Sequence, residues 1–266
     1  MVSYAHALDS RWRRLVIRTV ESVTGGWRIA RLYKVAKTYV DCGWDVWDSA
    51  LDVLRVRIGV ASHDVAKIPE SGPLLVIANH PFGLVDGVIL CHLVAKVRSD
   101  YKILLNNVLE QVDEIKPYIL PVDFRDSLAA RRVNARSAIE AKKLLHKGGV
   151  VIIFPSGGIS TSARPFGEAT DSEWKTFTAK LARVPKTTVL PVYFHGQNSR
   201  LFQIVSRFSQ TLRYSLLVKE FRNQIGREIA VKIGEPLPPE RIAEFPDHGA
   251  LTRFLRATTY RLKDRV

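Results

Sequence analysis

The chain has little cysteine and no long apolar run. Cys42 and Cys91 are its two cysteines among 266 residues, so a disulfide scaffold and a cysteine-based zinc cluster are excluded and a reducing compartment is expected. No stretch approaches the roughly 18 consecutive apolar residues that suggest a membrane-spanning helix. The N-terminal region also lacks the apolar segment of a signal peptide. We therefore expect a cytoplasmic protein without a transmembrane helix.

Acidic side chains are scarce relative to basic ones. The chain has 40 Lys and Arg against 26 Asp and Glu, which gives a net charge of +14. Such a surface favours polyanionic partners, namely nucleic acid, anionic lipid or an acidic carrier protein. The apolar fraction of 46% and the charged fraction of 25% are ordinary for globular proteins, and they exclude extensive disorder.

Residues 11–58 show helical periodicity. Within residues 27–40 an apolar stripe runs beside a basic row at three-residue spacing, formed by Arg28, Arg31, Lys34 and Lys37. Four of the five tryptophans lie in the first 47 residues, a composition typical of helices at a lipid headgroup boundary. Helices that pack on a domain show the same apolar stripe, and both arrangements can hold together. We predict an amphipathic helical prefix over residues 1–58, followed by one domain over residues 59–266.

From residue 74, short apolar runs bounded by Gly and Pro alternate with helical stretches. The expected strands are LLVIA, YKILL, YILPV, VVIIF, TVLPVYF and IAVKIG. The expected helices cover residues 127–147, 172–184, 199–208 and 249–263. This alternation predicts an α/β fold with a central, mostly parallel or mixed sheet flanked by helices. The proline inside TVLPVYF predicts an edge strand or a bulge.

The stretch ANHPFGLVDG places a histidine and an aspartate after the first of these strands. His80 then lies at the carboxyl end of the strand, where open α/β sheets bind ligands. Asp86 falls in the first turn of a helix, from which a carboxylate can reach back to the imidazole. Such a pair is the general-base half of a Ser-His-Asp triad and suits a substrate that supplies its own hydroxyl. A helix-terminal acid beside an unreactive loop histidine has the same spacing, so the spacing alone leaves both readings open.

A second segment, VVIIFPSGGISTSARP, runs from a strand into a glycine-rich turn. Gly157 and Gly158 let the backbone approach a ligand closely, and a turn rich in Ser and Thr presents N–H donors to an oxyanion or a phosphate. Arg164 adds a cation that can clamp an anionic group. A third segment, TVLPVYFHGQNSRLF, ends a strand in a polar turn.

Taken in order, these segments resemble the blocks of the glycerolipid acyltransferase superfamily, the lysophosphatidic acid acyltransferase-like proteins. That family has an N-H-x-x-x-x-D block, an F-P-E-G-T block and a strand block with V-x-P-V, which resemble NHPFGLVD, FPSGG and VLPVYF here. The bacterial hemolysin-like branch has NHP-x-G-x-x-D, FP-x-G and G-x-NS elements, and HGQNSRLF is similar to the last of these. The resemblance covers roughly residues 70 to 240.

Two departures from the family pattern bear on the site. Five residues rather than four separate His80 from Asp86, as in the hemolysin-like branch, so the pair is expected to persist. Ser156 stands where most members have a glutamate, in a block associated with the glycerol-phosphate acceptor. The substrate-binding residues that we predict are Asn79, Phe154, Pro155, Ser156, Gly157, Gly158, Arg125 and Arg164.

The resemblance implies an O-acyltransferase that moves a fatty acyl group from acyl carrier protein or coenzyme A to the hydroxyl of a lysolipid. His80 is expected to act as base, Asp86 to orient it, and N–H groups near Gly157 and Gly158 to hold the acceptor or the developing charge. We expect no cofactor and no metal. The expected acceptor is 1-acylglycerol-3-phosphate-like, with a lyso-aminolipid such as lyso-ornithine lipid as the alternative. A peripheral position on an anionic membrane surface, at the cytoplasmic face, follows from this chemistry.

Two other classes of function compete with this interpretation. A nucleic-acid-binding protein fits the net charge, but the basic residues are spread along amphipathic helices, and neither zinc-ligand spacing nor an aromatic RNA-binding signature is present. We therefore expect no nucleic-acid partner. A non-catalytic membrane or lipid-binding protein with the same fold is the second alternative, and the presence of both His80 and Asp86 argues against it.

Overall fold

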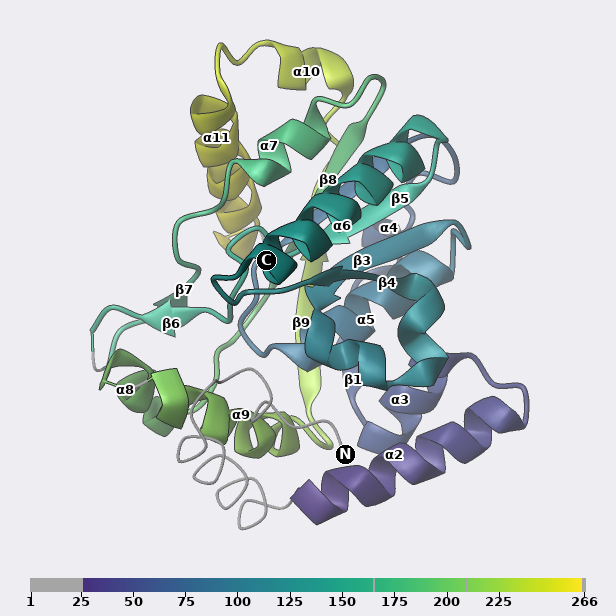
Figure 1. Ribbon diagram of the computed structural model, residues 1–266, viewed down its shortest axis with the longest axis vertical. Coiled ribbons are helices and arrows are strands. Elements are labelled where there is room, and N and C mark those ends of the chain that lie inside the picture. Colours follow the sequence, from purple (N-terminus) through teal and green to yellow (C-terminus); the bar gives the residue numbers. More distant parts are fainter. Residues whose placement is uncertain (1–25, 165, 209, 265–266) are drawn as a thin grey trace.

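The computed structural model describes residues 26–164, 166–208 and 210–264 (Figure 1). A seven-stranded sheet has the order β1-β9-β8-β2-β5-β3-β4. Its strands are β1 (Arg57–Gly59), β2 (Leu74–Ala78), β3 (Tyr101–Asn106), β4 (Ile119–Val122), β5 (Val150–Ile153), β8 (Thr188–Phe194) and β9 (Glu228–Ile233). A separate antiparallel pair joins β6 (Thr161–Ser162) and β7 (Ala169–Thr170).

Most of the sheet is parallel. The neighbouring strands β8, β2, β5, β3 and β4 all run in one direction, whereas β9 is antiparallel to β8 and β1 is parallel to β9. The predicted α/β fold with a mostly parallel or mixed sheet is therefore confirmed, and each of the six expected apolar runs contains one of these strands.

Helices follow most of the strands. The α-helices are α2 (Gly26–Asp41), α3 (Val46–Leu54), α4 (Ser62–Val65), α5 (Leu84–Ala95), α6 (Leu128–His146), α7 (Phe177–Ala182), α8 (Arg200–Phe208), α9 (Gln210–Asn223), α10 (Pro239–Ala243) and α11 (His248–Tyr260). Short 3₁₀ turns are η2 (Asn107–Gln111), η3 (Asp113–Tyr118) and η4 (Arg261–Asp264). The helix expected over 172–184 shortens to α7, because Lys175 N donates to Pro155 O at 3.0 Å and ties the preceding residues to another loop.

Alternate residues of β2 face two apolar clusters, one on each side of the sheet. Leu74, Val76 and Ala78 pack with α3 and α5, and Leu75 and Ile77 pack with α6, α7 and α11. Because successive strand side chains point to opposite faces, a strand covered on both faces must be apolar throughout. This explains the uninterrupted LLVIA run.

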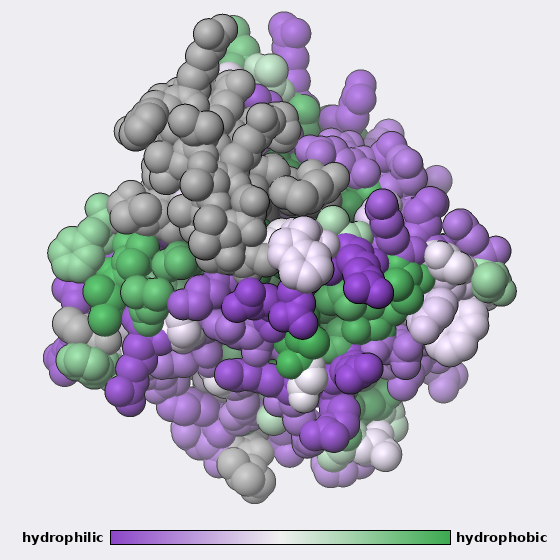
Figure 2. All heavy atoms as spheres, turned by 90° about the horizontal axis from the view of Figure 1, so that it is seen from below, coloured by the Kyte–Doolittle hydropathy of each residue, from purple (hydrophilic) through white to green (hydrophobic). Residues whose placement is uncertain are grey.

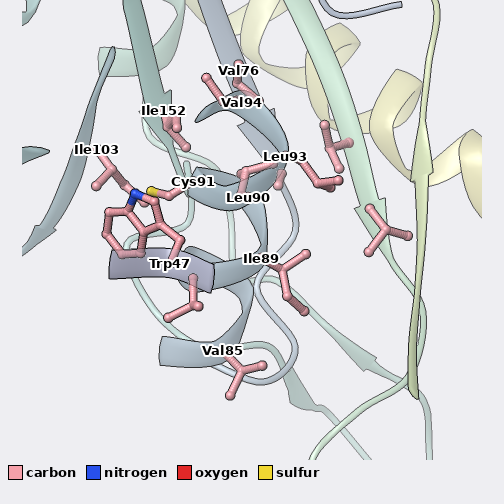
Figure 3. Close-up of a cluster of buried hydrophobic side chains, with 14 of the residues drawn as sticks. Trp47, Val76, Val85, Ile89, Leu90, Cys91, Leu93, Val94, Ile103 and Ile152 are labelled. Atoms are coloured by element: carbon pink, nitrogen blue, oxygen red, sulfur yellow. The ribbon is translucent and has the colours of Figure 1, made fainter. Parts of the chain in front are cut away.

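Helix α5 lies in the middle of the first cluster and is apolar on nearly all sides (Figure 3). Its Leu90 and Cys91 are buried beside Trp47 of α3 and Ile152 of β5. A helix buried on all sides cannot shift without breaking the core around it. The first turn of α5 is thereby held in place, and that turn carries Asp86.

The two helices of the N-terminal region differ in their environment. Helix α3 belongs to the core, since Trp47 is only 3% exposed, whereas the basic row of α2 lies in solvent. The predicted helix over residues 11–58 holds for 26–41 and 46–54, but residues 57–59 form β1, because they pair with β9. Residues 1–25 lie outside the described residues, and the domain boundary at residue 58 stays a prediction. Among the helices described, none is long and apolar enough to cross a membrane.

Pro191 lies inside the sheet, so the edge-strand prediction for TVLPVYF is wrong. Strand β8 has β2 on one side and β9 on the other. The ladder with β9 begins at Val192, and Pro191 contributes its carbonyl, which accepts from Gly234 N at 2.8 Å. A proline is tolerated where the neighbouring strand ends, because no ladder bond is lost there.

Candidate active site

The loop that carries His80 is joined to the end of β8 by Asn79. The Asn79 side chain donates from Nδ2 to Phe194 O at 2.9 Å and accepts at Oδ1 from Phe194 N at 2.7 Å. Both amide atoms are thus engaged by Phe194, and only 4% of the residue is exposed. Asn79 fixes the carboxyl ends of β2 and β8 to each other, and its role in substrate binding stays a prediction.

Asp86 reaches back from the first turn of α5 to the histidine. Its Oδ2 accepts from Phe82 N at 2.9 Å and from Gly83 N at 3.0 Å, and lies 3.0 Å from His80 Nδ1. Gly83 has φ +84°, and a Cβ there would lie 2.7 Å from Ile159 Cδ1, so the turn requires glycine. This turn accommodates the one extra residue relative to the family pattern, so His80 and Asp86 still lie next to each other.

The two groups of the pair lie in different environments. Asp86 is completely buried, and this burial raises the pKa of its carboxyl, while the interaction with His80 and the two N–H donors act to lower it. The His80 side chain is 15% exposed, and its ring stacks on Phe154 with centroids 3.9 Å apart. Because Nδ1 faces the carboxylate, Nε2 is the nitrogen left for a substrate proton.

His80 lines a cavity of about 640 Å³ at the carboxyl ends of the parallel strands. The predicted block Phe154, Pro155, Ser156, Gly157 and Gly158 also lies on its wall, together with apolar residues from β3, η2 and α5. Lys175 and Arg213 contribute positive charge, and no Asp or Glu is found among the described lining residues. The cavity therefore combines a base with an electropositive wall.

The hydroxyl of Ser156 is used within its own turn. It donates to Gly158 O at 2.8 Å, and Gly158 N approaches it at 3.4 Å. Gly157 N in turn donates to Phe154 O at 3.0 Å. These N–H groups are engaged in the turn, so the expectation that they hold the acceptor or an oxyanion is not supported by the geometry. Gly157 instead has φ +70° and leaves space for Lys175, whose Nζ would lie 3.0 Å from a Cβ at this position.

Neither predicted arginine lies on the cavity wall. Arg125 forms a two-point ion pair with Asp123, at 2.6 Å from Nη2 to Oδ2 and 3.0 Å from Nε to Oδ1. Arg164 is exposed in the loop between β6 and β7. A role for these two arginines in substrate binding gains no support from this cavity and stays a prediction. The cations on the wall are Lys175, in the loop before α7, and Arg213, in α9.

A buried carboxylate that the sequence did not indicate joins the loop that carries His80 to the loop that follows β5. Asp171 Oδ1 accepts from His80 N at 3.2 Å and from Ser160 Oγ at 2.5 Å, and its Oδ2 accepts from Trp174 Nε1 at 2.8 Å. Ser160 N also donates to His80 O at 2.8 Å. Asp171 thus holds the backbone of His80 against the loop that follows β5. These partners are far apart in the chain, and no local pattern marks them.

Comparison with known proteins shows that the chain is similar to lipid acyltransferases. Two relatives, each named lyso-glycine lipid O-acyltransferase, come from Phocaeicola vulgatus and Bacteroides thetaiotaomicron. Both are 24% identical, over 231 and 232 residues respectively; these alignments cover 83% of this chain and 78% and 80% of the relatives. The crystal structure of the 1-acyl-sn-glycerophosphate acyltransferase PlsC from Thermotoga maritima is similar in fold. Its TM-score is 0.50 at 17% identity, over 98% of this chain and 85% of that one.

A family model described as Acyltransferase matches residues 49–266, which include the dyad, the Phe154 to Gly158 block and all of the sheet. Since this match extends over most of the chain, the protein belongs to that acyltransferase family, within the glycerolipid acyltransferase superfamily, and is an acyltransferase of lipid metabolism.

Proposed function

We propose that this lysolipid O-acyltransferase uses His80 as its general base and Asp86 to orient it, and that it takes the acyl group from a thioester of acyl carrier protein or coenzyme A. The observation that carries the proposal is the 3.0 Å approach of His80 Nδ1 to the buried Asp86 Oδ2, with the imidazole on the cavity wall. A histidine held in this way by a carboxylate presents a fixed tautomer to its substrate.

The reaction needs one base and one activated acyl group. His80 Nε2 removes the proton of the acceptor hydroxyl as its oxygen attacks the thioester carbonyl carbon, and the resulting imidazolium is stabilised by Asp86. When the tetrahedral intermediate collapses, the C–S bond breaks and His80 returns the proton to the departing thiolate. The products are the ester and a free thiol, and the base is regenerated.

The shape of the interior supports a substrate with a fatty chain. Leu84, Leu105 and Leu109 line the catalytic cavity and also a second cavity of about 410 Å³. The second cavity lies between α2, α3 and α5, and its wall is mostly aliphatic. Apolar surface next to the dyad favours an acyl chain, since each buried CH₂ contributes about 0.8 kcal/mol.

For the acceptor, we propose a lysolipid built on an amino acid rather than 1-acylglycerol-3-phosphate. Both relatives are named for lyso-glycine lipid. In addition, Ser156 replaces the usual glutamate of the family block, and its hydroxyl is closed into a turn. These observations favour a lyso-aminolipid, the alternative acceptor that the sequence suggested, over 1-acylglycerol-3-phosphate.

The acceptor preference can be measured directly. The purified protein is supplied with acyl carrier protein and coenzyme A thioesters in parallel, and with lyso-glycine lipid, lyso-ornithine lipid or 1-acylglycerol-3-phosphate as acceptor. We expect kcat/KM for an amino-acid lysolipid to exceed that for the glycerophosphate by about tenfold or more, as for a site that is matched to its polar group. A higher kcat/KM for 1-acylglycerol-3-phosphate would contradict this assignment.

We propose that the underside of the molecule rests on an anionic membrane at its cytoplasmic face. Figure 2 shows apolar side chains gathered over α8 on one side and along α2 on the other. Trp27 and Trp44 are 65% and 53% exposed, next to the solvated basic row of α2. Exposed tryptophan beside Lys and Arg suits the headgroup region. Trp47 does not take part, because it is buried in the core.

Point variants are the appropriate test of membrane binding, since removal of residues 1–47 would also take Trp47 out of the core. The triple variant Arg28→Gln, Arg31→Gln, Lys34→Gln should sediment less with phosphatidylglycerol vesicles, because each cation near an anionic surface contributes about 1 kcal/mol. The matched control neutralises three exposed cations on α6, α7 and α11, namely Lys142, Lys180 and Arg253. Equal sedimentation of the two triple variants would refute this orientation.

A further inference from the structure

Lys175 is a cation of the catalytic cavity that the mechanism above does not use. Its main chain is fixed, because Lys175 N donates to Pro155 O at 3.0 Å. Its ammonium group lies 5.2 Å from the ring centroid of Phe124, and it forms no ion pair in the part of the chain that the structure describes. A positive group that faces a cavity without a carboxylate partner is available to an anionic ligand.

Arg213 adds a second positive charge beside the same glycine-rich turn. Its Nη2 donates to Ile159 O at 2.7 Å, and its guanidinium carbon lies 5.9 Å from the ring centroid of Phe202. A Cβ on Gly158 would lie 3.7 Å from Arg213 Nη2, as a Cβ on Gly157 would lie 3.0 Å from Lys175 Nζ. Gly157 therefore lets Lys175 approach the turn more closely than a side chain would allow, whereas the distance at Gly158 is an ordinary contact that places Arg213 next to the same turn.

We propose that Lys175, with Arg213 beside it, binds the anionic headgroup of the acceptor lysolipid. The proposal rests on the function assigned above and adds which chemical group of the acceptor the cations recognise, namely a headgroup anion, which is a carboxylate in the proposed amino-acid lysolipid and a phosphate in the competing glycerophosphate. Glycine joined to a lipid through its amino group keeps such a carboxylate. The cations take the place of the family-block residues as headgroup ligands, because the Ser156 hydroxyl is occupied within its turn and neither Arg125 nor Arg164 is among the residues on the cavity wall.

Lys175 and His80 lie on the wall of the same cavity, and this arrangement suits an acceptor that binds through its headgroup. His80, Lys175 and the Phe154 to Gly158 block line one cavity, so a headgroup bound at Lys175 leaves the rest of the lysolipid within the same space as the imidazole. Binding through a charge far from the reacting hydroxyl orients the acceptor without touching the dyad. A loss of this contact should therefore appear in the KM for the acceptor rather than in kcat.

The test is a steady-state comparison of Lys175→Gln with the wild type. The acceptors are lyso-glycine lipid, its methyl ester, which has no headgroup charge, and 1-acylglycerol-3-phosphate, at a saturating concentration of acyl donor. We expect the KM for whichever charged acceptor the wild type uses to rise about tenfold, the size of one lost charge-assisted hydrogen bond. The kcat and the KM for the methyl ester should stay unchanged. Lys175→Arg should restore the KM, and Lys180→Gln, an exposed lysine of α7 outside the cavity wall, is the matched control.

The results of this test distinguish failure of the headgroup proposal from failure of the proposed function. An increase for the carboxylate acceptor alone, or for the phosphate acceptor alone, supports the proposal and identifies the anion. An unchanged KM for both, an equal loss with the methyl ester, or an increase in the KM for the donor instead would overturn it, because the cation then serves no acceptor headgroup. If the wild type acylates none of the acceptors, the proposed function itself fails.

Discussion

His80→Ala is expected to lower kcat by about a thousandfold or more, the upper range for loss of a general base. The imidazole lies on the cavity wall with the buried Asp86 carboxylate behind it. The substitution removes a partly exposed ring that stacks on Phe154, so the fold and vesicle binding should change little. The measurement is single-turnover acyl transfer, with circular dichroism to check the fold.

A second histidine on the same helix as Asp86 provides a matched control. His92 Nδ1 lies 2.7 Å from Asp48 Oδ1, a pair of the same kind, but His92 does not line the catalytic cavity. His92→Ala should keep wild-type turnover per folded molecule. If His80→Ala retained comparable turnover, the assignment of the base would be wrong.

Asp86→Asn is expected to cause the second largest loss, about a thousandfold in kcat, because an amide cannot stabilise the imidazolium and can favour the wrong tautomer. The amide oxygen can still accept from Phe82 N and Gly83 N, which Asp86 Oδ2 does in the wild type. The variant should therefore stay folded. Asp86→Ala removes this acceptor as well, and should in addition lower the free energy of unfolding by about 1 to 3 kcal/mol.

The pH dependence of stability should also differ between the wild type and Asp86→Asn. Burial raises the pKa of the Asp86 carboxyl above its ordinary value of 3.8, so the folded state binds this proton more tightly than the unfolded state. Protonation then stabilises the fold, and this contribution is lost as the pH rises from the ordinary value through the raised pKa. Relative to Asp86→Asn, the wild type should thus lose stability as the pH rises above about 4. Urea denaturation at several pH values measures this, and a wild type that gains stability relative to Asp86→Asn as the pH rises would contradict it.

Several features of the fold and of the site were readable in the sequence. The run LLVIA predicted a central strand, and the loop after it predicted the position of His80. The strand is buried at every position and His80 does lie at its carboxyl end. Local patterns are reliable here because a strand covered on both faces must be apolar, and a helix that starts soon after it must bring its first-turn acid back to the loop.

The remaining contacts depend on residues that meet only after folding. One exception is local: Arg125 looked like a ligand because it follows a strand, yet its guanidinium group pairs with Asp123 only two residues earlier. Lys175 and Asp171 carried no local signal, and they reach the site because a loop before α7 folds over the loop after β5. The placement of Pro191 within the sheet was likewise decided by where β9 ends.

The sequence by itself indicated the α/β class and the order of the strands along the chain, and its resemblance to the family blocks singled out His80 and Asp86. These features depend on runs and motifs that can be read along the chain. The tertiary structure decided which cations face the cavity and that Asn79 joins two strands. Hydrogen bonds and ion pairs are formed with the nearest partner in space, and a sequence does not show how far apart those partners lie once the sheet has formed.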